Sequence, residues 1–114
     1  MRDFATCTGR FSAEVEHAWL VRTIEAERHS QMYDNMSALL DAVTSPDDEI
    51  SARALLIEAK AAHSRLLLQA AFGWDAERRR IAEKRARFLL LSCTALILAD
   101  AREDATKIWA AGTE

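Results

Sequence analysis

The sequence predicts an all-α fold: a three-helix antiparallel bundle with long first and third helices that assembles into a dimer. Only three glycines and one proline occur in 114 residues, and residues that favour helices, such as alanine, leucine, glutamate and arginine, are abundant. Half of the residues are hydrophobic, which suffices for one core. We therefore expect a flexible N-terminal arm over 1–11, a single helical domain over 12–110 and a tail over 111–114.

The first helix is expected to begin at Ser12 and to end near Val43. Apolar residues recur along it at intervals of three and four, which is the spacing of one helix face. The polar run 25–31 interrupts this spacing. Both a solvated stretch of one continuous helix and a kink fit such a run, and polar runs usually lie on solvated faces. We therefore favour one continuous helix.

The second helix is expected from Pro46 to Phe72. The Ser45 hydroxyl is suited to cap backbone N–H groups, proline suits the first helical position, and two aspartates follow at the positive end of the helix dipole. An apolar stripe at helical spacing predicts the side that packs into the core. It consists of Ile50, Ala54, Ile57, Ala61, Leu68 and Ala71, and Leu56, Leu66 and Leu67 widen it.

The third helix is expected to follow almost at once, from Asp75 to Trp109. Gly73 is expected to end the second helix in a left-handed conformation and Asp75 to cap the third, so that the two form an antiparallel hairpin. Residues 88–99 are apolar around the whole helix circumference, which requires cover on several sides. This run is too short for a membrane span of ~20 residues. A three-helix bundle leaves one of its faces uncovered, and we expect a protein partner there.

The segment 78–87 precedes this run and contains six basic residues. At 100° per residue they point in all directions, whereas DNA-reading helices place such contacts on one side. The formal net charge of −3 also disfavours general nucleic-acid binding. When the chain is folded at its two turns, Glu25 and Glu27 come level with this segment, so we expect ion pairs between the helices.

The same alignment of neighbouring helices, with the chain folded at its two turns, brings His29 and His63 close together beside Glu25. Histidine and glutamate are common zinc ligands, but no dense ligand motif is present, and we predict no metal site. The sequence also contains no recognisable nucleophile arrangement and no glycine-rich phosphate loop. We therefore predict no enzymatic activity, no catalytic residue and no cofactor.

Cys7 and Cys93 are the only cysteines, and they lie far apart without a C-x-x-C or Cys/His spacing. We expect two free thiols, with Cys93 filling the core, and neither a disulfide nor a zinc site. Residues 1–11 lack the apolar stretch of a secretory signal. The predicted location is therefore the cytoplasm.

Side chains suited to contact a partner protein recur along the first and third helices. Tryptophan and tyrosine are enriched among interface anchors, and methionine adapts to irregular grooves. The apolar run of the third helix adds large aliphatic side chains. The expected partner-binding residues are Trp19, Met32, Tyr33, Met36, Phe88, Leu91, Ile97, Leu98 and Trp109.

The size, the number of helices, the long first helix, the segments 45–48 and 72–75 and the run 88–99 together resemble the QslA-like quorum-sensing anti-activators, a family of small bacterial regulators. The resemblance implies a dimeric protein without enzymatic activity that binds a LuxR-type transcription factor and blocks its dimerisation or DNA binding. The residues themselves leave two alternatives open. One is a nucleic-acid-associated regulator that uses segment 78–87, and the other is a structural homodimer subunit.

Overall fold

The computed structural model of the chain describes the backbone of residues 1–21 and 25–112 and the side chains of residues 1–21 and 25–98. The elements are α1 (Arg2–Val21), α2 (Ala26–Val43), the 3₁₀ helix η1 (Pro46–Asp48), α3 (Glu49–Phe72) and α4 (Ala76–Gly112). All regular structure in these residues is helical, which confirms the all-α prediction. The predicted count of three helices is wrong, because the residues expected in one first helix are divided between α1 and α2.

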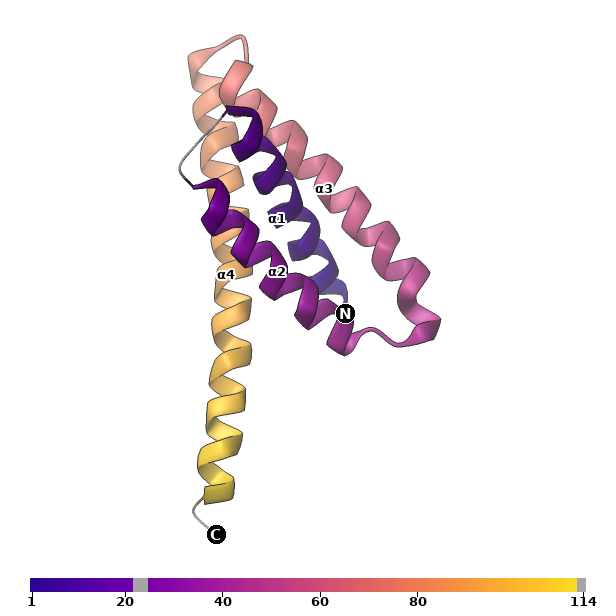
Figure 1. Ribbon diagram of the computed structural model, residues 1–114. Coiled ribbons are helices and arrows are strands. Elements are labelled where there is room, and N and C mark those ends of the chain that lie inside the picture. The colour runs from indigo at the N-terminus through magenta and orange to yellow at the C-terminus, as the bar shows by residue number, and fades with distance from the viewer. Residues whose placement is uncertain (22–24, 113–114) are drawn as a thin grey trace.

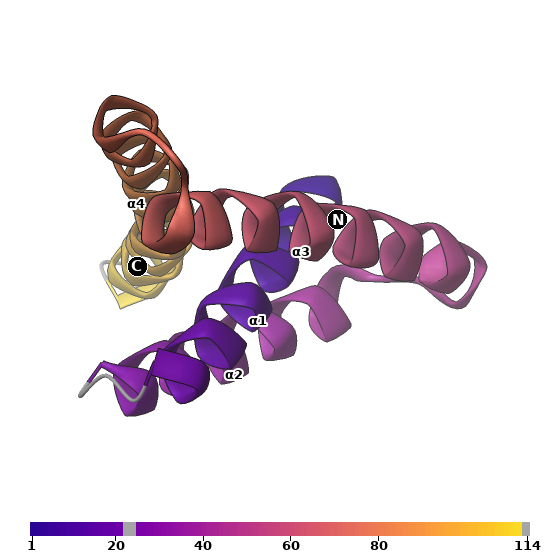
Figure 2. The ribbon, with the colours of Figure 1, turned by 90° about the horizontal axis from the view of Figure 1, so that it is seen from above.

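The four helices alternate in direction, and α1 lies at the centre (Figure 1). α1 packs along α2 and α3, whereas α4 packs mainly along α3. Seen from above, α3 crosses α1, and α4 stands beside them close to the line of sight (Figure 2). α4 has 37 residues, and its C-terminal part runs beyond the ends of the other three helices (Figure 1).

Residues 2–11 form the start of α1 and not part of the flexible arm that the sequence predicted over 1–11. Ala5, Thr8 and Phe11 are buried there, at the three-residue spacing of a helix face. Most buried side chains of α1 are small, so a search for large apolar residues does not reveal this face. The central helix of the fold thus begins well before the predicted Ser12.

α1 and α3 approach each other closely at Gly9. A Cβ atom at this position would collide with the carbonyl oxygen of Leu56 and would lie 2.9 Å from the backbone nitrogen of Lys60. It would also lie 3.0 Å from the Cβ atom of Ala59. Because backbone atoms cannot move aside as a side chain can, any residue larger than glycine would force the two helices apart.

The core follows α1 in three clusters of buried side chains. The largest joins α1, α2 and α4 and consists of Cys7, Phe11, Met36 and Cys93. The other two consist of Ala5, Leu40 and Ala52, and of Ala13, Leu67 and Ala86. Alanine is the commonest member of these clusters, so the helices are held together largely by close approach of their backbones.

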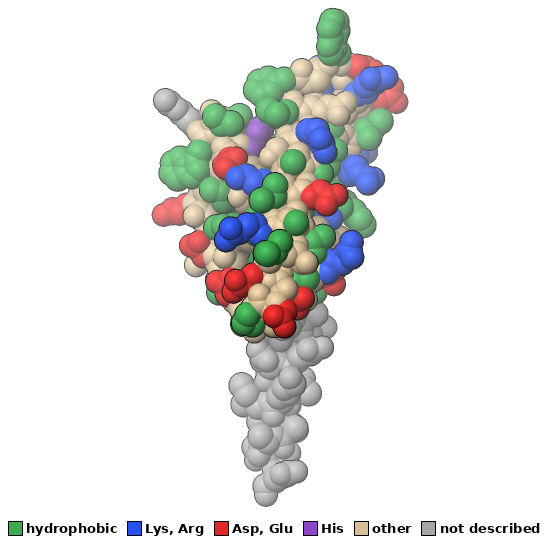
Figure 3. Space-filling view, turned by 90° about the vertical axis from the view of Figure 1, so that its right-hand side faces the viewer, with side chains coloured by type: hydrophobic (Ala, Val, Ile, Leu, Met, Phe, Trp, Pro, Cys, Tyr) green, Lys and Arg blue, Asp and Glu red, His purple; other side chains and the backbone are tan. Residues whose placement is uncertain are grey.

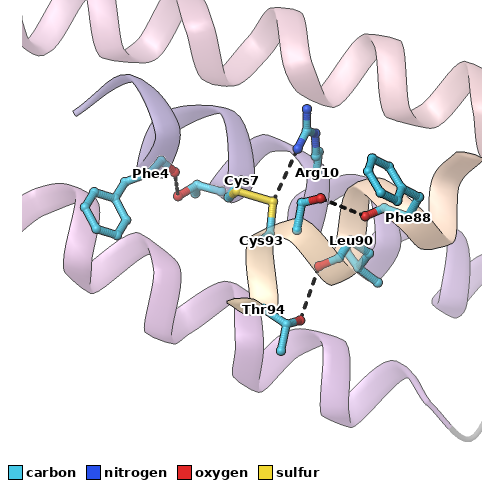
Figure 4. The surroundings of a disulfide bond; sticks show 9 residues. Phe4, Cys7, Arg10, Phe88, Leu90, Cys93 and Thr94 are labelled. Atoms are coloured by element: carbon cyan, nitrogen blue, oxygen red, sulfur yellow. Dashed lines mark hydrogen bonds between the residues drawn. A yellow bond between two sulfur atoms is a disulfide. The ribbon is translucent and has the colours of Figure 1, made fainter. Parts of the chain in front are cut away.

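A disulfide bond joins Cys7 of α1 to Cys93 of α4, with the Cα atoms 5.5 Å apart (Figure 4). The prediction of two free thiols is therefore wrong. The two cysteines are separated by 86 positions in the sequence, and no local spacing marks them as a pair. They meet because α1 and α4 run in opposite directions through the same core cluster.

Both predicted turns are confirmed in position, but their local mechanisms differ from the prediction. Ser45 precedes η1, and its hydroxyl donates to Oδ2 of Asp48 at 2.9 Å instead of accepting from a backbone N–H group. Gly73 has φ −60° and ψ 152°, which is extended and not left-handed. Glycine suits this position because a Cβ atom would press on the carbonyl oxygen of Gln69. Asp75 accepts a hydrogen bond from the backbone N–H two residues later, as expected of a cap.

Candidate protein-interaction surface

The most exposed apolar side chains of α4 form one stripe on its outer side. Phe88, Leu91 and Leu98 are 67%, 62% and 61% exposed, and Ile81 and Ala95 are exposed as well. From residue 81 onward the spacings are seven, three, four and three, so the five side chains share a helix face. We call these five residues the outer stripe of α4.

The opposite side of α4 is packed against the rest of the molecule. Ala82, Ala86 and Cys93 are buried there, and Leu96 and Ile97 are partly buried against the core. The two apolar sides explain why the run 88–99 is apolar around its circumference: one side is used within the chain and the other faces solvent. In the part of the chain that the structure describes, no helix has the length and apolar character needed to cross a membrane.

Basic side chains flank the outer stripe of α4 on both edges. On a helical projection Arg78 and Arg85 lie along one edge, and Arg80 and Arg87 along the other. All four are exposed. Arg87 pairs with Glu83 in the preceding turn at 3.1 Å. The stripe therefore has positively charged borders up to Phe88, and the exposed Lys84, seven positions before Leu91, lies within it.

A second exposed apolar stripe follows the outer side of α3. It contains the six residues that the sequence predicted for the core side of this helix: Ile50, Ala54, Ile57, Ala61, Leu68 and Ala71. The inner side buries Ala52, His63 and Leu67, of which only Leu67 belonged to the predicted stripe, as one of the residues that widen it. The prediction was wrong because α3 is also apolar on two sides. On the face shown in Figure 3, hydrophobic side chains lie exposed among basic and acidic ones. We call the six residues the outer stripe of α3.

The residues predicted to bind a partner occupy different environments. The exposed ones are Trp19, Phe88, Leu91 and Leu98. Those partly buried against the core are Met32, Tyr33 and Ile97. Met36 is fully buried between α1, α2 and α4, so it is a core residue and not a partner contact. Trp109 lies outside the described side chains.

Further exposed apolar residues lie at the ends of helices, where the sequence prediction did not place them. Phe72 and Trp74 are exposed at the turn between α3 and α4, and Leu20 is exposed near the end of α1. The position of Trp74 within a short turn is a signal that could have identified it, because the turn offers few neighbours to cover an indole ring.

A buried polar cluster joins three helices. The Nε2 atom of His63 in α3 lies 2.9 Å from Oε1 of Glu14 in α1. The Nε2 atom of His29 in α2 lies 3.8 Å from Oε2 of Glu14 and 3.6 Å from Oε2 of Glu25. The predicted proximity of the two histidines is confirmed, but Glu14, which links them, was missed. No pattern in the sequence around Glu14 indicates that its side chain is buried.

These contacts bear on two further expectations from the sequence. Glu25 faces His29, and the ion pairs predicted between Glu25 or Glu27 and segment 78–87 are absent from the described residues. Within the same residues, no group of three or more histidine, cysteine, aspartate or glutamate side chains could hold a metal ion. The contacts of Glu14 with His63 and His29 join α1 to α3 and to α2.

Comparison with protein-family models, with curated proteins and with solved structures found no match to this chain. The outer stripes, their charged borders and the buried polar cluster are therefore interpreted from their own geometry and chemistry.

Proposed function

We propose that this chain is a non-enzymatic interaction protein that inhibits a transcriptional regulator by covering one of its apolar helix surfaces. The outer stripe of α4 carries the proposal, because Phe88, Leu91 and Leu98 are exposed on a helix that is already packed on its opposite side. Contiguous exposed apolar side chains of this kind mark protein contacts. The resemblance to the QslA-like anti-activators supports a LuxR-type quorum-sensing receptor as the partner.

The proposed mechanism is packing of one helix on another. The three- and four-residue spacings of the outer stripe of α4 suit knobs-into-holes packing against a partner helix. Burial of one large apolar side chain contributes about 1.5–3 kcal/mol, so Phe88, Leu91 and Leu98 together supply a substantial part of a binding energy. A receptor that dimerises through a helix could not do so while α4 occupies that helix.

We assign the outer stripe of α3 to a homodimer contact. Its neighbouring charges have both signs, for example Arg53 and Glu58, so two copies can place opposite charges together. The outer stripe of α4 has basic side chains on both edges, so two copies packed in parallel would bring like charges together, which disfavours that pairing. The two stripes therefore suit different partners: α3 a second copy, and α4 a different protein.

The proposed location is the cytoplasm, where a transcriptional regulator acts. The Cys7–Cys93 disulfide bears on this proposal, because disulfides persist in oxidising compartments and are rare in the cytosol. In a reducing cytoplasm both thiols would remain in the core cluster, where a cysteine packs as a small apolar residue. The disulfide would then form only under oxidising conditions.

Leu91→Glu and Leu98→Glu test the α4 contact. Each is expected to abolish binding to a LuxR-type receptor ligand-binding domain in isothermal titration calorimetry, because the stripe would have to bury a carboxylate. The unfolding midpoint should stay nearly unchanged, since both leucines are exposed. Ala38→Glu, at an exposed alanine of α2 away from both stripes, is the matched control. Unaltered binding by both α4 variants would refute the proposed contact.

Ile57→Glu tests the assignment of the α3 contact separately. It is expected to lower the molar mass measured by light scattering from that of a dimer to that of a monomer, because Ile57 lies in the outer stripe of α3 and is exposed in the single chain. Receptor binding per chain should persist. A dimer that withstands Ile57→Glu and dissociates with Leu91→Glu would reverse the two assignments.

A further inference from the structure

A groove of about 630 Å³ lies between α1, α3 and α4. Its apolar lining comes mainly from Leu55, Ala59, Ala62 and Leu66, which follow one side of α3 at spacings of four, three and four. Leu89 of α4 adds to it. The two alanines leave room where larger side chains would fill the space. No residue of the outer stripe of α4 lines this groove, and the two surfaces adjoin at Arg85, which lies at one edge of that stripe.

Four arginines surround this apolar lining. Arg2 and Arg10 come from α1, Arg65 from α3 and Arg85 from α4, whereas Glu58 is the acidic residue that lines the groove. Among the described side chains the ion pairs involve Lys60, Arg87 and two histidines, and none of these four arginines. The groove therefore combines an apolar surface with positive charge that the chain itself leaves largely unneutralised.

Arg10 is the deepest of the four arginines. Burial lowers the pKa of its guanidinium, and Asp3 opposes that shift. The Nη1 atom donates to Sγ of Cys93 at 3.5 Å (Figure 4), and a sulfur atom is a weak acceptor. A guanidinium has five N–H donors in a planar fork that matches a carboxylate. An anionic oxygen in the groove would thus give Arg10 a stronger partner than the disulfide sulfur does.

His63 provides an independent observation in the same groove. It lines the groove and is 1% exposed, and its Nε2 atom bonds to Glu14, which does not line the groove. Its Nδ1 atom is buried and has no hydrogen-bond partner among the described residues. Buried polar atoms are rarely left without a partner in native proteins. A carboxylate complements this nitrogen when both ring nitrogens carry a proton, because the Nδ1–H group then donates to a carboxylate oxygen while the Nε2–H group donates to Glu14.

We infer that this groove binds a small amphipathic carboxylic acid, with the acid group held by Arg10, Arg85 and His63 and the apolar chain lying along α3. The volume falls within the ~300–1,000 Å³ range of small-molecule sites, which combine apolar walls with a few converging polar groups.

Octanoate serves as the probe for this inference, with acetate and octanamide as controls. Acetate keeps the acid group without the chain, and octanamide keeps the chain without the charge. Octanoate added to the oxidised full-length protein is expected to shift the backbone amide resonances of Ala59, Ala62 and Leu66, which line the groove. Calorimetry should give an affinity for octanoate at least about tenfold higher than for either control, because both halves of the ligand are recognised.

Two pairs of variants locate the ligand. Arg85→Gln is expected to weaken octanoate binding about tenfold, whereas Arg80→Gln, at an exposed arginine of α4 outside the groove, should leave it unchanged. Ala62→Trp should block binding by filling the groove, whereas Ala61→Trp, on the neighbouring outer stripe of α3, should not. All four positions are exposed, so the variants are expected to fold.

Three results would overturn the inference. One is the absence of octanoate binding at millimolar concentration. The second is equal binding of octanoate and octanamide, which would make the arginines irrelevant. The third is a set of resonance shifts confined to the outer stripe of α4, for example at Leu91 and Leu98, which would indicate unspecific adsorption of an apolar chain.

Discussion

The Oε1 atom of Glu14 in α1 lies 2.9 Å from the Nε2 atom of His63 in α3, inside the contact between the two helices. Both side chains are largely withdrawn from solvent. Because water cannot readily replace the missing partner there, removal of one side chain leaves the other with an unsatisfied polar group.

Glu14→Ala is therefore expected to lower the free energy of unfolding by about 1–3 kcal/mol, measured by urea denaturation followed by circular dichroism. Glu16→Ala is the matched control one half-turn away. Glu16 is exposed and pairs with Lys60 at 2.5 Å, and exposed ion pairs contribute at most ~1 kcal/mol. Equal losses from both substitutions would show that Glu14 is solvated in solution.

Substitutions at the adjacent residues Leu67 and Leu68 test which side of α3 faces the core. Leu67 is 8% exposed and packs with the core, whereas Leu68 is 49% exposed on the outer stripe of α3. Leu67→Ala is expected to cost about 2–5 kcal/mol of unfolding free energy, and Leu68→Ala about 0.5 kcal/mol. The measurement is made by chemical denaturation at a concentration where light scattering gives a monomer. A larger loss for Leu68→Ala would mean that α3 is rotated.

Gly9→Ala tests the close approach of α1 and α3. Alanine favours a helix by about 1 kcal/mol over glycine, but overpacking of a helix contact costs about 1–3 kcal/mol. Since the added Cβ would meet backbone atoms of Leu56 and Lys60, a net loss in the melting temperature is expected. Ser51→Ala, at an exposed position of α3, changes helix propensity without a collision. If Gly9→Ala raised the melting temperature as a propensity gain would, the two helices could not cross at this residue.

Reduction of the Cys7–Cys93 disulfide is expected to destabilise the fold strongly. The bond closes a loop over 86 positions, and the loop-entropy relation gives on the order of 4–5 kcal/mol for a loop of this length. Thermal unfolding with and without a reductant measures the loss. The Cys7→Ser, Cys93→Ser double variant should unfold at the temperature of the reduced protein and be insensitive to reductant. Two titratable thiols in the oxidised, denatured chain would contradict the bond.

The helix boundaries could be predicted where the signals are local. Proline, glycine and capping carboxylates act within a few residues, which is why the turns near 45–48 and 72–75 were found. The start of α1 could not be found in this way, because its buried face consists largely of small residues such as Ala5, Thr8 and Gly9. The run 25–31 did contain a signal for the separation of α1 and α2, but polarity alone does not distinguish a helix start from a solvated helix face.

The exposed surface could be predicted only in part. On a helix that is apolar on two sides, the spacing of apolar residues does not show which side is buried and which is exposed. Phe88, Leu91 and Leu98 were predicted as partner contacts and are exposed, whereas the neighbouring Ile97 turns towards the core. For α3 the exposed side was predicted as the core side. Which side of α3 faces the core depends on the position of α1. That position follows from contacts between residues far apart in the sequence, such as Gly9 with Leu56.

The bond between Cys7 and Cys93 also limits when the fold can be completed during synthesis of the chain. Cys7 leaves the ribosome before its partner, which follows only after α2, α3 and half of α4 have been made. The bond between α1 and α4 can therefore form only after the 86 positions that separate the two cysteines have been synthesised. Until then Cys7 is a nascent thiol without its disulfide partner.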